Sequence, residues 1–309
     1  MLRYIGKRLF MMLITLWLIT SLTFVLMHSI PGDPFTSEKK LPEQTLINLK
    51  AQYGLDKPLP VQYALYMKNI ITLDLGFSIK NTSRSVNDML EDGFPVSAQL
   101  GLQSVILATL VGVGMGAIAA LRQNRPMDYV IMVVAVLGLS LPNFVIGPLF
   151  QKYFGLEWDL MPIAGWGEFD QTILPSIALS FLPLALVTRL MRSSMLEVMG
   201  QDYIRTARAK GLPPWRVIGF HTVRNSIIPV ITIIGPMLAA ILTGSFVIEK
   251  IFSIPGIGKY FVESITNRDY PVIMGSTIFF AAVLIFLNFI VDLAYGFIDP
   301  RIKVGKKEA

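Results

Sequence analysis

Few side chains in this sequence could carry out catalysis or bind a metal ion. There is no cysteine, and the two histidines, His28 and His221, are far apart in the chain. Disulfides, thiolate metal sites and cysteine nucleophiles are therefore excluded, and so is a metal site built from several histidines. The His-Glu-x-x-His and Gly-x-Ser-x-Gly patterns of metalloproteases and serine hydrolases are also missing. The sequence therefore gives no support to a membrane-embedded enzyme.

Three glycines at alternate positions are the nearest approach to a nucleotide-binding pattern. Gly112, Gly114 and Gly116 lie inside an apolar run instead of following a strand, so we interpret them as small residues that permit close helix packing. No P-loop occurs in the sequence. If the protein works with ATP, hydrolysis takes place on another chain.

A polar and mostly basic stretch, residues 197–229, separates two long apolar segments. Its pattern predicts a short helix over 200–210, a left-handed cap at Gly211, a stop at Pro213-Pro214 and a second helix from Trp215 towards Asn225. Two interpretations are open. The stretch lies on anionic lipid through its arginines, or it forms a compact docking element whose small residues let a partner approach closely.

The elements around this stretch are membrane spans. The 309 residues are 53% hydrophobic and 16% charged, against about 25% charged in soluble domains. Apolar runs of spanning length indicate a polytopic, all-α membrane protein, and the ten-residue alternation of a β-barrel is missing. The first run is too long for a cleaved signal peptide, so we expect it to be retained. The six predicted spans are residues 9–30, 98–121, 129–153, 173–193, 229–248 and 276–298.

The predicted organisation has four parts. Residues 1–30 form the N-terminus and the first span, and 31–97 form a small polar cap with short helices at 41–54, 60–71 and 86–90. Residues 98–299 form the permeation core, which contains a loop at 194–228, and 300–309 form a tail. The cap is too short to bury a sizeable core alone.

Charge predicts the orientation. Six spans place both termini on one side, and 16 of the 27 basic residues lie on that side. Of the 21 acidic residues, 15 lie in the opposite loops. By the positive-inside rule, the termini and residues 197–229 are cytoplasmic and the cap is outside. The net charge of +6 therefore reflects membrane topology and not nucleic-acid binding.

Several motifs along the whole chain resemble one family. Within the polar stretch, a small residue, three further residues, a glycine and a later Ile-Ile-Pro are similar to the EAA loop of binding-protein-dependent ABC importer permeases. The oligopeptide/dipeptide/nickel branch, and within it the B-type subunit of oligopeptide permeases, is the most similar. The supporting motifs are Met1-Leu2-Arg3-Tyr4-Ile5, Pro31-Gly32-Asp33-Pro34, Tyr53-Gly54-Leu55-Asp56-Lys57-Pro58, Asp74-Leu75-Gly76-Phe77-Ser78, Ile254-Pro255-Gly256-Ile257-Gly258 and Arg268-Asp269-Tyr270-Pro271.

The resemblance implies a type I ABC importer (MetI-like) permease fold and a transport subunit that is not itself an enzyme. The loop would dock into an ATP-binding subunit through Tyr203, Arg205, Thr206, Ala207, Lys210 and Gly211. Expected partners are a homologous second permease, two ATP-binding subunits that hold ATP and Mg²⁺, and an extracytoplasmic substrate-binding protein. This chain would bind no cofactor. Arg205 and Thr206 replace the family's glutamate and first alanine, so a role specific to that glutamate does not carry over.

An ion-coupled secondary transporter is the alternative function. It would need acids within the membrane and an internal repeat of spans. We find no clear repeat, and Asp292 is the single acid inside a predicted span. Its place near the end of the last span favours a structural contact over proton coupling. Among substrates we expect oligopeptides first, then dipeptides, then nickel.

Overall fold

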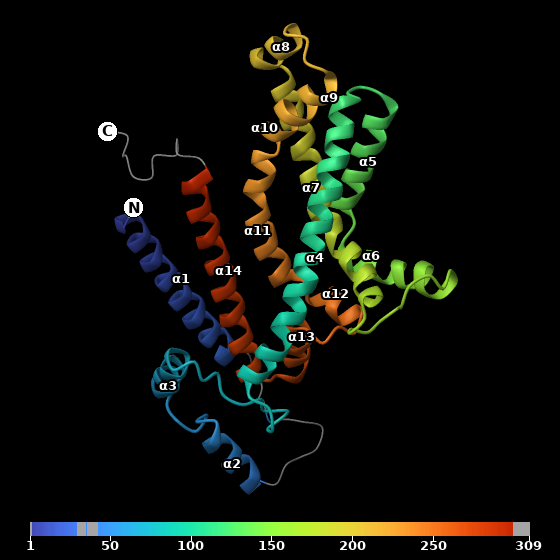
Figure 1. The fold of residues 1–309 in the computed structure, drawn as a ribbon. Helices are drawn as coiled ribbons and strands as arrows, with labels where there is room; N and C mark the ends of the chain where they lie inside the picture. The colour runs from blue at the N-terminus through green and yellow to red at the C-terminus, as the bar shows by residue number, and fades with distance from the viewer. Residues whose placement is uncertain (1, 30–34, 36–42, 299–309) are drawn as a thin grey trace. The chain divides into compact units, whose positions relative to one another are not determined.

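The computed structural model describes residues 2–29, 35 and 43–298. Helices make up nearly all of the regular structure there, and a single isolated β-bridge joins Phe77 and Ser85 (Figure 1). The elements, including two π-helical segments η1 and η2, are α1 Leu2–Ser29, α2 Glu43–Gln52, α3 Leu59–Ile71, α4 Val86–Leu121, α5 Pro126–Ser140, α6 Asn143–Phe150, η1 Gln151–Glu157, α7 Phe169–Met199, α8 Asp202–Ala209, α9 Pro214–Arg216, η2 Val217–Val223, α10 Arg224–Ser226, α11 Ile228–Gly244, α12 Phe246–Ile251, α13 Ile257–Asn267 and α14 Tyr270–Ile298.

The helices confirm a polytopic all-α membrane protein. Four of them, α1, α4, α7 and α14, are long and apolar enough to cross a membrane. Two bent pairs of helices raise the number to six if each pair counts as one span. Each of the six predicted spans thus coincides largely with helix in the described residues, although the boundaries differ.

One short helix predicted for the cap is not a separate element. Residues 86–90 do not form a separate helix, because α4 continues without interruption from Val86 to Leu121. Pro95 lies inside this helix, where it removes one backbone donor. Its side chain is exposed, so the pyrrolidine ring is not forced into a packed interface.

The third predicted span is broken and not merely kinked. The α5 helix ends at Ser140, and the following segment, α6 with η1, is turned by 106°. Leu141 has extended dihedrals, φ −89° and ψ 118°, because the ring of Pro142 disfavours the α conformation in the residue before it. In α7, by contrast, the helix continues through Pro175 and Pro183.

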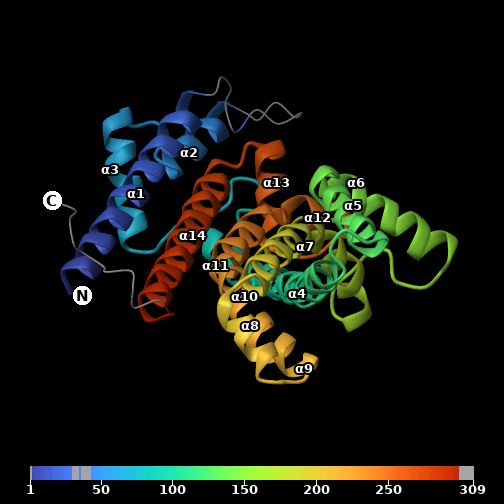
Figure 2. The same cartoon turned by 90° about the horizontal axis from the view of Figure 1, so that it is seen from above.

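The described chain divides into two compact units. Residues 2–96 with 256–285 form one, and 97–255 with 286–298 form the other. In the first unit, α1 and the start of α14 lie side by side (Figures 1 and 2). Phe24 and Met27 pack there against Tyr270, Ile273 and Met274.

In the second unit, α4 and α7 approach closely at glycines. A Cβ atom on Gly112 would lie 2.8 Å from Val187 Cγ1, and one on Gly116 would lie 2.6 Å from the Thr188 carbonyl oxygen. Nothing lies within 4 Å of the corresponding position on Gly114. Two of the three glycines therefore serve helix packing, as the sequence predicted.

Candidate functional site

Residues 202–226 form a compact two-helix element between α7 and α11. The first helix is α8, and α9, η2 and α10 together form the second. Ile204, Ala207 and Val217 are buried between them, with Val198 and Leu212 packed against this small core. Because each helix buries one apolar face against the other, the element is a folded knob and not an extended connector.

A glycine ends α8 in the way the sequence predicted. Gly211 has φ +77°, a conformation that glycine adopts without strain. Its N–H donates to the Arg208 carbonyl at 2.9 Å, and the Leu212 N–H donates to the Ala207 carbonyl at 3.3 Å. This pair of bonds is a Schellman motif. It turns Leu212 back onto the inner core, and Pro214 then begins the second helix.

The predicted docking residues fall into two groups. Tyr203, Arg205, Thr206, Lys210 and Gly211 are all exposed. Ala207 is 6% exposed and faces the inner core, so its small size serves the packing of the two helices. Arg205 forms an ion pair with Asp202 at 3.6 Å between largely exposed side chains, which contributes little stability and leaves the guanidinium accessible.

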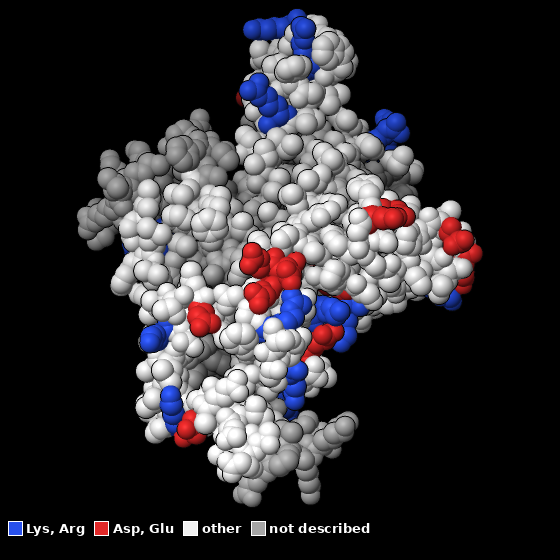
Figure 3. Space-filling model, turned by 60° about the horizontal axis from the view of Figure 1, so that its bottom comes forward, with Lys and Arg blue, Asp and Glu red and all other residues white. Residues whose placement is uncertain are grey.

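The second helix adds an apolar surface that the sequence reasoning did not single out. Trp215 and Phe220 are 63% and 61% exposed, and the guanidinium of Arg216 lies 5.2 Å from the Trp215 ring centroid. Lys and Arg side chains gather where the two-helix element lies, at the top of the view in Figure 3. The two-helix element therefore combines positive charge with exposed aromatic side chains, and this combination is common at protein interfaces. The signal was present in the sequence as Pro-Pro-Trp-Arg.

Two of the sequence motifs meet in the first unit, residues 2–96 with 256–285. There Asp269 joins the start of α14 to the loop before α4. Asp269 is 3% exposed. Its carboxylate accepts a bond from the Ser78 hydroxyl, one from the Ile79 N–H at 3.1 Å and one from the Lys80 N–H at 3.3 Å. The Tyr53 hydroxyl donates to the Ser78 carbonyl at 3.0 Å; burial, and secondarily the charge of Asp269, raise the pKa of Tyr53. These contacts fix the loop at 76–80 to the start of α14.

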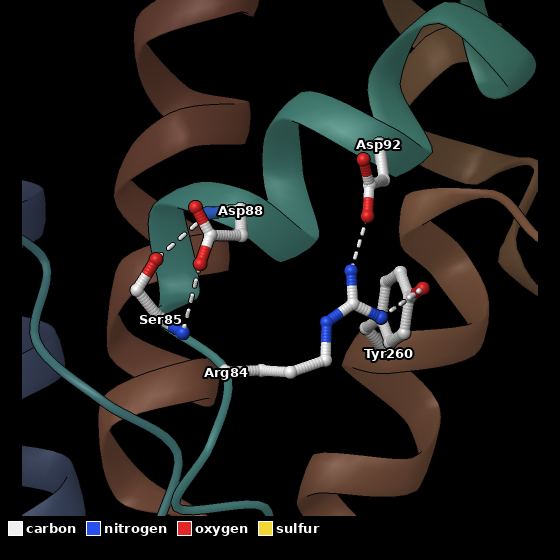
Figure 4. Close-up of polar contacts among 5 residues, drawn as sticks. All are labelled: Arg84, Ser85, Asp88, Asp92 and Tyr260. Atoms are coloured by element: carbon white, nitrogen blue, oxygen red, sulfur yellow. Dashed lines mark hydrogen bonds and ion pairs between the residues drawn. The ribbon is translucent and has the colours of Figure 1, made fainter.

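A second polar cluster surrounds the first turn of α4 (Figure 4). Arg84 contacts Asp92 and donates to the Tyr260 hydroxyl at 3.2 Å. The Tyr260 bond raises the pKa of Arg84, and Asp92 adds to this effect. Ser85 and Asp88 cap the helix reciprocally, with N–H bonds of 3.2 and 3.0 Å. This arrangement can position a helix start, and it contains no nucleophile with an adjacent base.

Both histidines have structural surroundings. His28 stacks on Phe24 with 4.0 Å between ring centroids. Its Nδ1 contacts the Phe24 carbonyl at 2.8 Å and its Nε2 contacts Gln62 Oε1 at 3.0 Å. His221 is partly buried within η2. Among the described residues, no group of three or more His, Cys, Asp or Glu could hold a metal ion. The side chain of Asp292 lies outside the described residues.

Two buried acids were missed because they lie at span boundaries. Asp128, 2% exposed, is clamped by Arg192 through two bonds of 2.7 Å and accepts the Asn124 N–H at 3.0 Å. Glu249 is fully buried and accepts a bond from the Ser245 hydroxyl at 2.5 Å. A first-turn acid after Pro126 and an arginine in the next span were the available signals for the Asp128–Arg192 pair.

Comparison of the sequence with models of known protein families shows which family this chain belongs to. Residues 112–304 match the family of binding-protein-dependent transport system inner membrane components, and residues 1–101 match the N-terminal model of the same kind of membrane component. The chain belongs to this family of ABC importer permeases. It is therefore an inner-membrane transport component and not an enzyme, as the sequence resemblance implied.

Individual relatives agree with this family over their full length. The chain is 55% identical to the dipeptide transport system permease protein DppB of Bacillus subtilis, over 99% of this chain and 100% of that protein. It is 42% identical to the oligopeptide transport system permease protein OppB of Escherichia coli, over 98% and 100% of the two chains. A crystal structure of an amino acid ABC transporter with histidines has a TM-score of 0.52 at 15% identity, and covers 67% of this permease and 93% of that chain. This last likeness supports the permease fold alone.

Proposed function

We propose that this permease moves short peptides into the cell and that its two-helix element, residues 202–226, receives the motion of a separate ATP-binding subunit. The observation that supports this proposal is that the element folds as one body and exposes the predicted docking residues. Ile204, Ala207 and Val217 join its two helices into one body, while Tyr203, Arg205, Thr206, Lys210 and Gly211 remain exposed. A body with its own small core can transmit a push to α7 and α11, which a flexible loop cannot.

The proposed assembly contains this permease, a homologous second permease, two ATP-binding subunits and an extracytoplasmic substrate-binding protein. ATP and Mg²⁺ would bind to the ATP-binding subunits, and this chain would hold no cofactor. The positive-inside distribution of basic residues supports cytoplasmic termini and a cytoplasmic two-helix element. The cap would then face the substrate-binding protein.

Among peptides we place dipeptides first, which reverses the order expected from the sequence. Two relatives named for dipeptide transport are 55% and 49% identical to this chain, whereas relatives named for oligopeptide transport are 42% identical. All of these comparisons cover nearly the whole chain, so the difference is not one of alignment length. An ion-coupled transporter has no comparable support.

Reconstitution tests the energy source. The complete complex in proteoliposomes should take up a labelled dipeptide only when the binding protein, both ATP-binding subunits and ATP are present. Uptake by this chain alone under an ion gradient would contradict the proposal and favour a secondary transporter.

The natural lack of cysteine allows a direct test of docking. Single-cysteine variants Tyr203→Cys and Lys210→Cys should cross-link to the ATP-binding subunits in the assembled complex. Trp158→Cys, at an exposed position on the side that we place outside, is the control and should give no such product. Equal cross-linking from all three positions, or none from the first two, would count against the docking role.

The same variants test orientation. A membrane-impermeant maleimide added to intact cells should label Trp158→Cys, and should label Lys210→Cys only after the membrane is permeabilised. The opposite labelling pattern would show that the chain has the reverse of the orientation we propose.

A further inference from the structure

Two arginines of α7 lie one turn apart and differ in their partners. Arg192 holds both carboxylate oxygens of Asp128, and its side chain is 24% exposed. Arg189 is exposed, and within the described part of the chain no hydrogen bond or ion pair involves its side chain. One guanidinium is therefore neutralised by the fold and the other is not.

Both arginines line a cavity of about 970 Å³ in the second unit. The cavity lies along α7 and α11, which are adjacent (Figures 1 and 2). Its wall is mainly apolar, with Leu182, Leu186 and Met237 as examples, and Asn143 and Ser193 add polar groups. Such a surface suits a ligand with variable apolar groups and a few fixed polar ones.

Arg189 lies toward the cytoplasmic end of its predicted span, residues 173–193. A charge at such a place that lines a cavity without a protein partner points to a function. A guanidinium presents a planar fork of donors that matches a carboxylate with two parallel bonds. Arg192 has already directed its Nε and one terminal nitrogen at Asp128. Arg189 is therefore the residue of the pair that is available to an incoming anion.

A short peptide carries one invariant anion, its C-terminal carboxylate, beside side chains of many kinds. We infer that Arg189 is a specificity-determining residue that binds the C-terminal carboxylate of a peptide crossing the membrane, while the apolar wall of the cavity accepts the side chains. The inference rests on the proposed peptide transport. It adds the part of the peptide that is recognised and the residue that recognises it.

The test compares two peptides in two proteins. The assembled complex is reconstituted with saturating binding protein, and uptake of a dipeptide with a free C-terminus is compared with uptake of its C-terminal amide. The ratio of the two rates is measured for the unaltered permease and for Arg189→Gln. The same binding protein delivers both peptides to the unaltered permease and to the variant. Its own selectivity therefore cancels when the ratio of uptake rates for one permease is divided by the ratio for the other.

Arg189→Gln should lower uptake of the free-acid peptide by about tenfold or more, the effect of losing a charged hydrogen-bonded partner. Uptake of the amide should change less than about twofold, so the preference for the free acid is lost. Arg189→Lys keeps the charge without the fork and should give an intermediate preference. The control Arg122→Gln removes the same charge from an exposed turn and should leave the preference intact.

Assembly of each variant is checked by size-exclusion chromatography, and if Arg189→Gln fails to assemble, Arg189→Lys provides the comparison. Equal loss for both peptides would indicate a contact with a lipid phosphate or a neighbouring subunit and would overturn the inference, as would an unchanged preference. ATP-dependent uptake by the unaltered permease in those cases leaves the proposed function standing. If the unaltered complex moves neither peptide, the proposed function itself fails.

Discussion

Arg192 clamps Asp128 through two parallel hydrogen bonds of 2.7 Å, Nε to Oδ1 and Nη2 to Oδ2. The pair joins α7 to the first turn of α5, and the Asp128 side chain is 3% exposed. The same carboxylate caps the preceding turn by accepting the Asn124 N–H. One buried acid thus fixes both a helix start and the packing of two spans.

Removing one partner of this pair should destabilise the protein strongly. Arg192→Met leaves a buried carboxylate unpaired, which typically costs about 3–5 kcal/mol, and the thermal unfolding temperature in detergent should fall. Adding Asp128→Leu should recover most of the loss, because no buried charge then remains. Arg189→Met, one turn away and without a partner, is the control and should unfold close to the unaltered protein. Additive losses in the double variant would show that the two side chains are not coupled.

Asp269 should hold the loop at 76–80 in place. Asp269→Asn replaces the carboxylate that accepts bonds from three donors with an uncharged amide. We expect the free energy of local opening of this loop to fall by about 2–3 kcal/mol. Hydrogen exchange of the Ile79 and Lys80 amides should accelerate. Asp74→Asn is the matched control, since Asp74 is exposed and accepts a bond from the Gly76 N–H at 3.1 Å. Equal protection of these amides in both variants would contradict the role of Asp269.

The glycines of α4 offer a test of helix packing with an internal control. Gly116→Ala would place a methyl group 2.6 Å from the Thr188 carbonyl oxygen and 2.7 Å from Met191 Cβ. Backbone and Cβ atoms cannot yield easily, so we expect a loss of about 1–3 kcal/mol. Gly114→Ala meets nothing within 4 Å and should stabilise the helix by up to about 1 kcal/mol. Thermal unfolding of the two variants should therefore shift in opposite directions.

Tyr66 should lower stability at alkaline pH. Its hydroxyl is buried without a hydrogen-bond partner in the described structure, and burial raises its pKa. The folded state therefore keeps the phenol proton more firmly than the unfolded state. The resulting stability is present below about pH 10 and is lost as the pH rises above that value.

The variant Tyr66→Phe should remove this alkaline loss and leave stability at neutral pH nearly unchanged, because the hydroxyl makes no hydrogen bond within the described residues that the variant would lose. On the same helix, Tyr63 shares a hydrogen bond of 2.7 Å with Ser21. Tyr63→Phe breaks that bond and should cost about 1 kcal/mol. Unfolding temperatures at neutral and alkaline pH separate the two cases, and a larger neutral-pH loss for Tyr66→Phe would contradict the assignment.

Local signals in the sequence predicted local structure well. Gly211 followed by Pro213-Pro214 specified the end of α8 and the start of the next helix, because left-handed glycine and proline act on their own neighbours. Leu141-Pro142 also contained the break, but a proline can kink a helix or end it, and Pro183 in α7 does not interrupt its helix. Which outcome occurs depends on the packing around each proline.

Long-range pairs could not be read from the sequence. Ser78 and Asp269 belong to two motifs that were noticed separately, and 191 positions separate them. Asp128 was placed outside the third span by one residue, so its burial and its pairing with Arg192 were missed. For Ala207, the sequence identified the position but not the direction of its side chain, which faces Val217. Each of these facts depends on which helix faces which, and one sequence does not specify that.

Gly211 provides the sharpest test of the two-helix element. Gly211→Val puts a β-branched residue at φ +77°, a conformation that such residues strongly disfavour. The Leu212–Ala207 bond should be lost and Leu212 should leave the inner core. Because α8 would then no longer be fixed to the second helix, docking of the ATP-binding subunit should persist while its motion is no longer passed to the spans. We expect ATP hydrolysis to continue and the number of peptides moved per ATP to fall several-fold.

Gly211→Asn is the matched control, since asparagine tolerates the left-handed conformation and should keep coupling near its normal value. Full transport by Gly211→Val with normal docking would contradict the coupling role, and equal loss in both variants would show that bulk at this position, and not its backbone conformation, disturbs the contact.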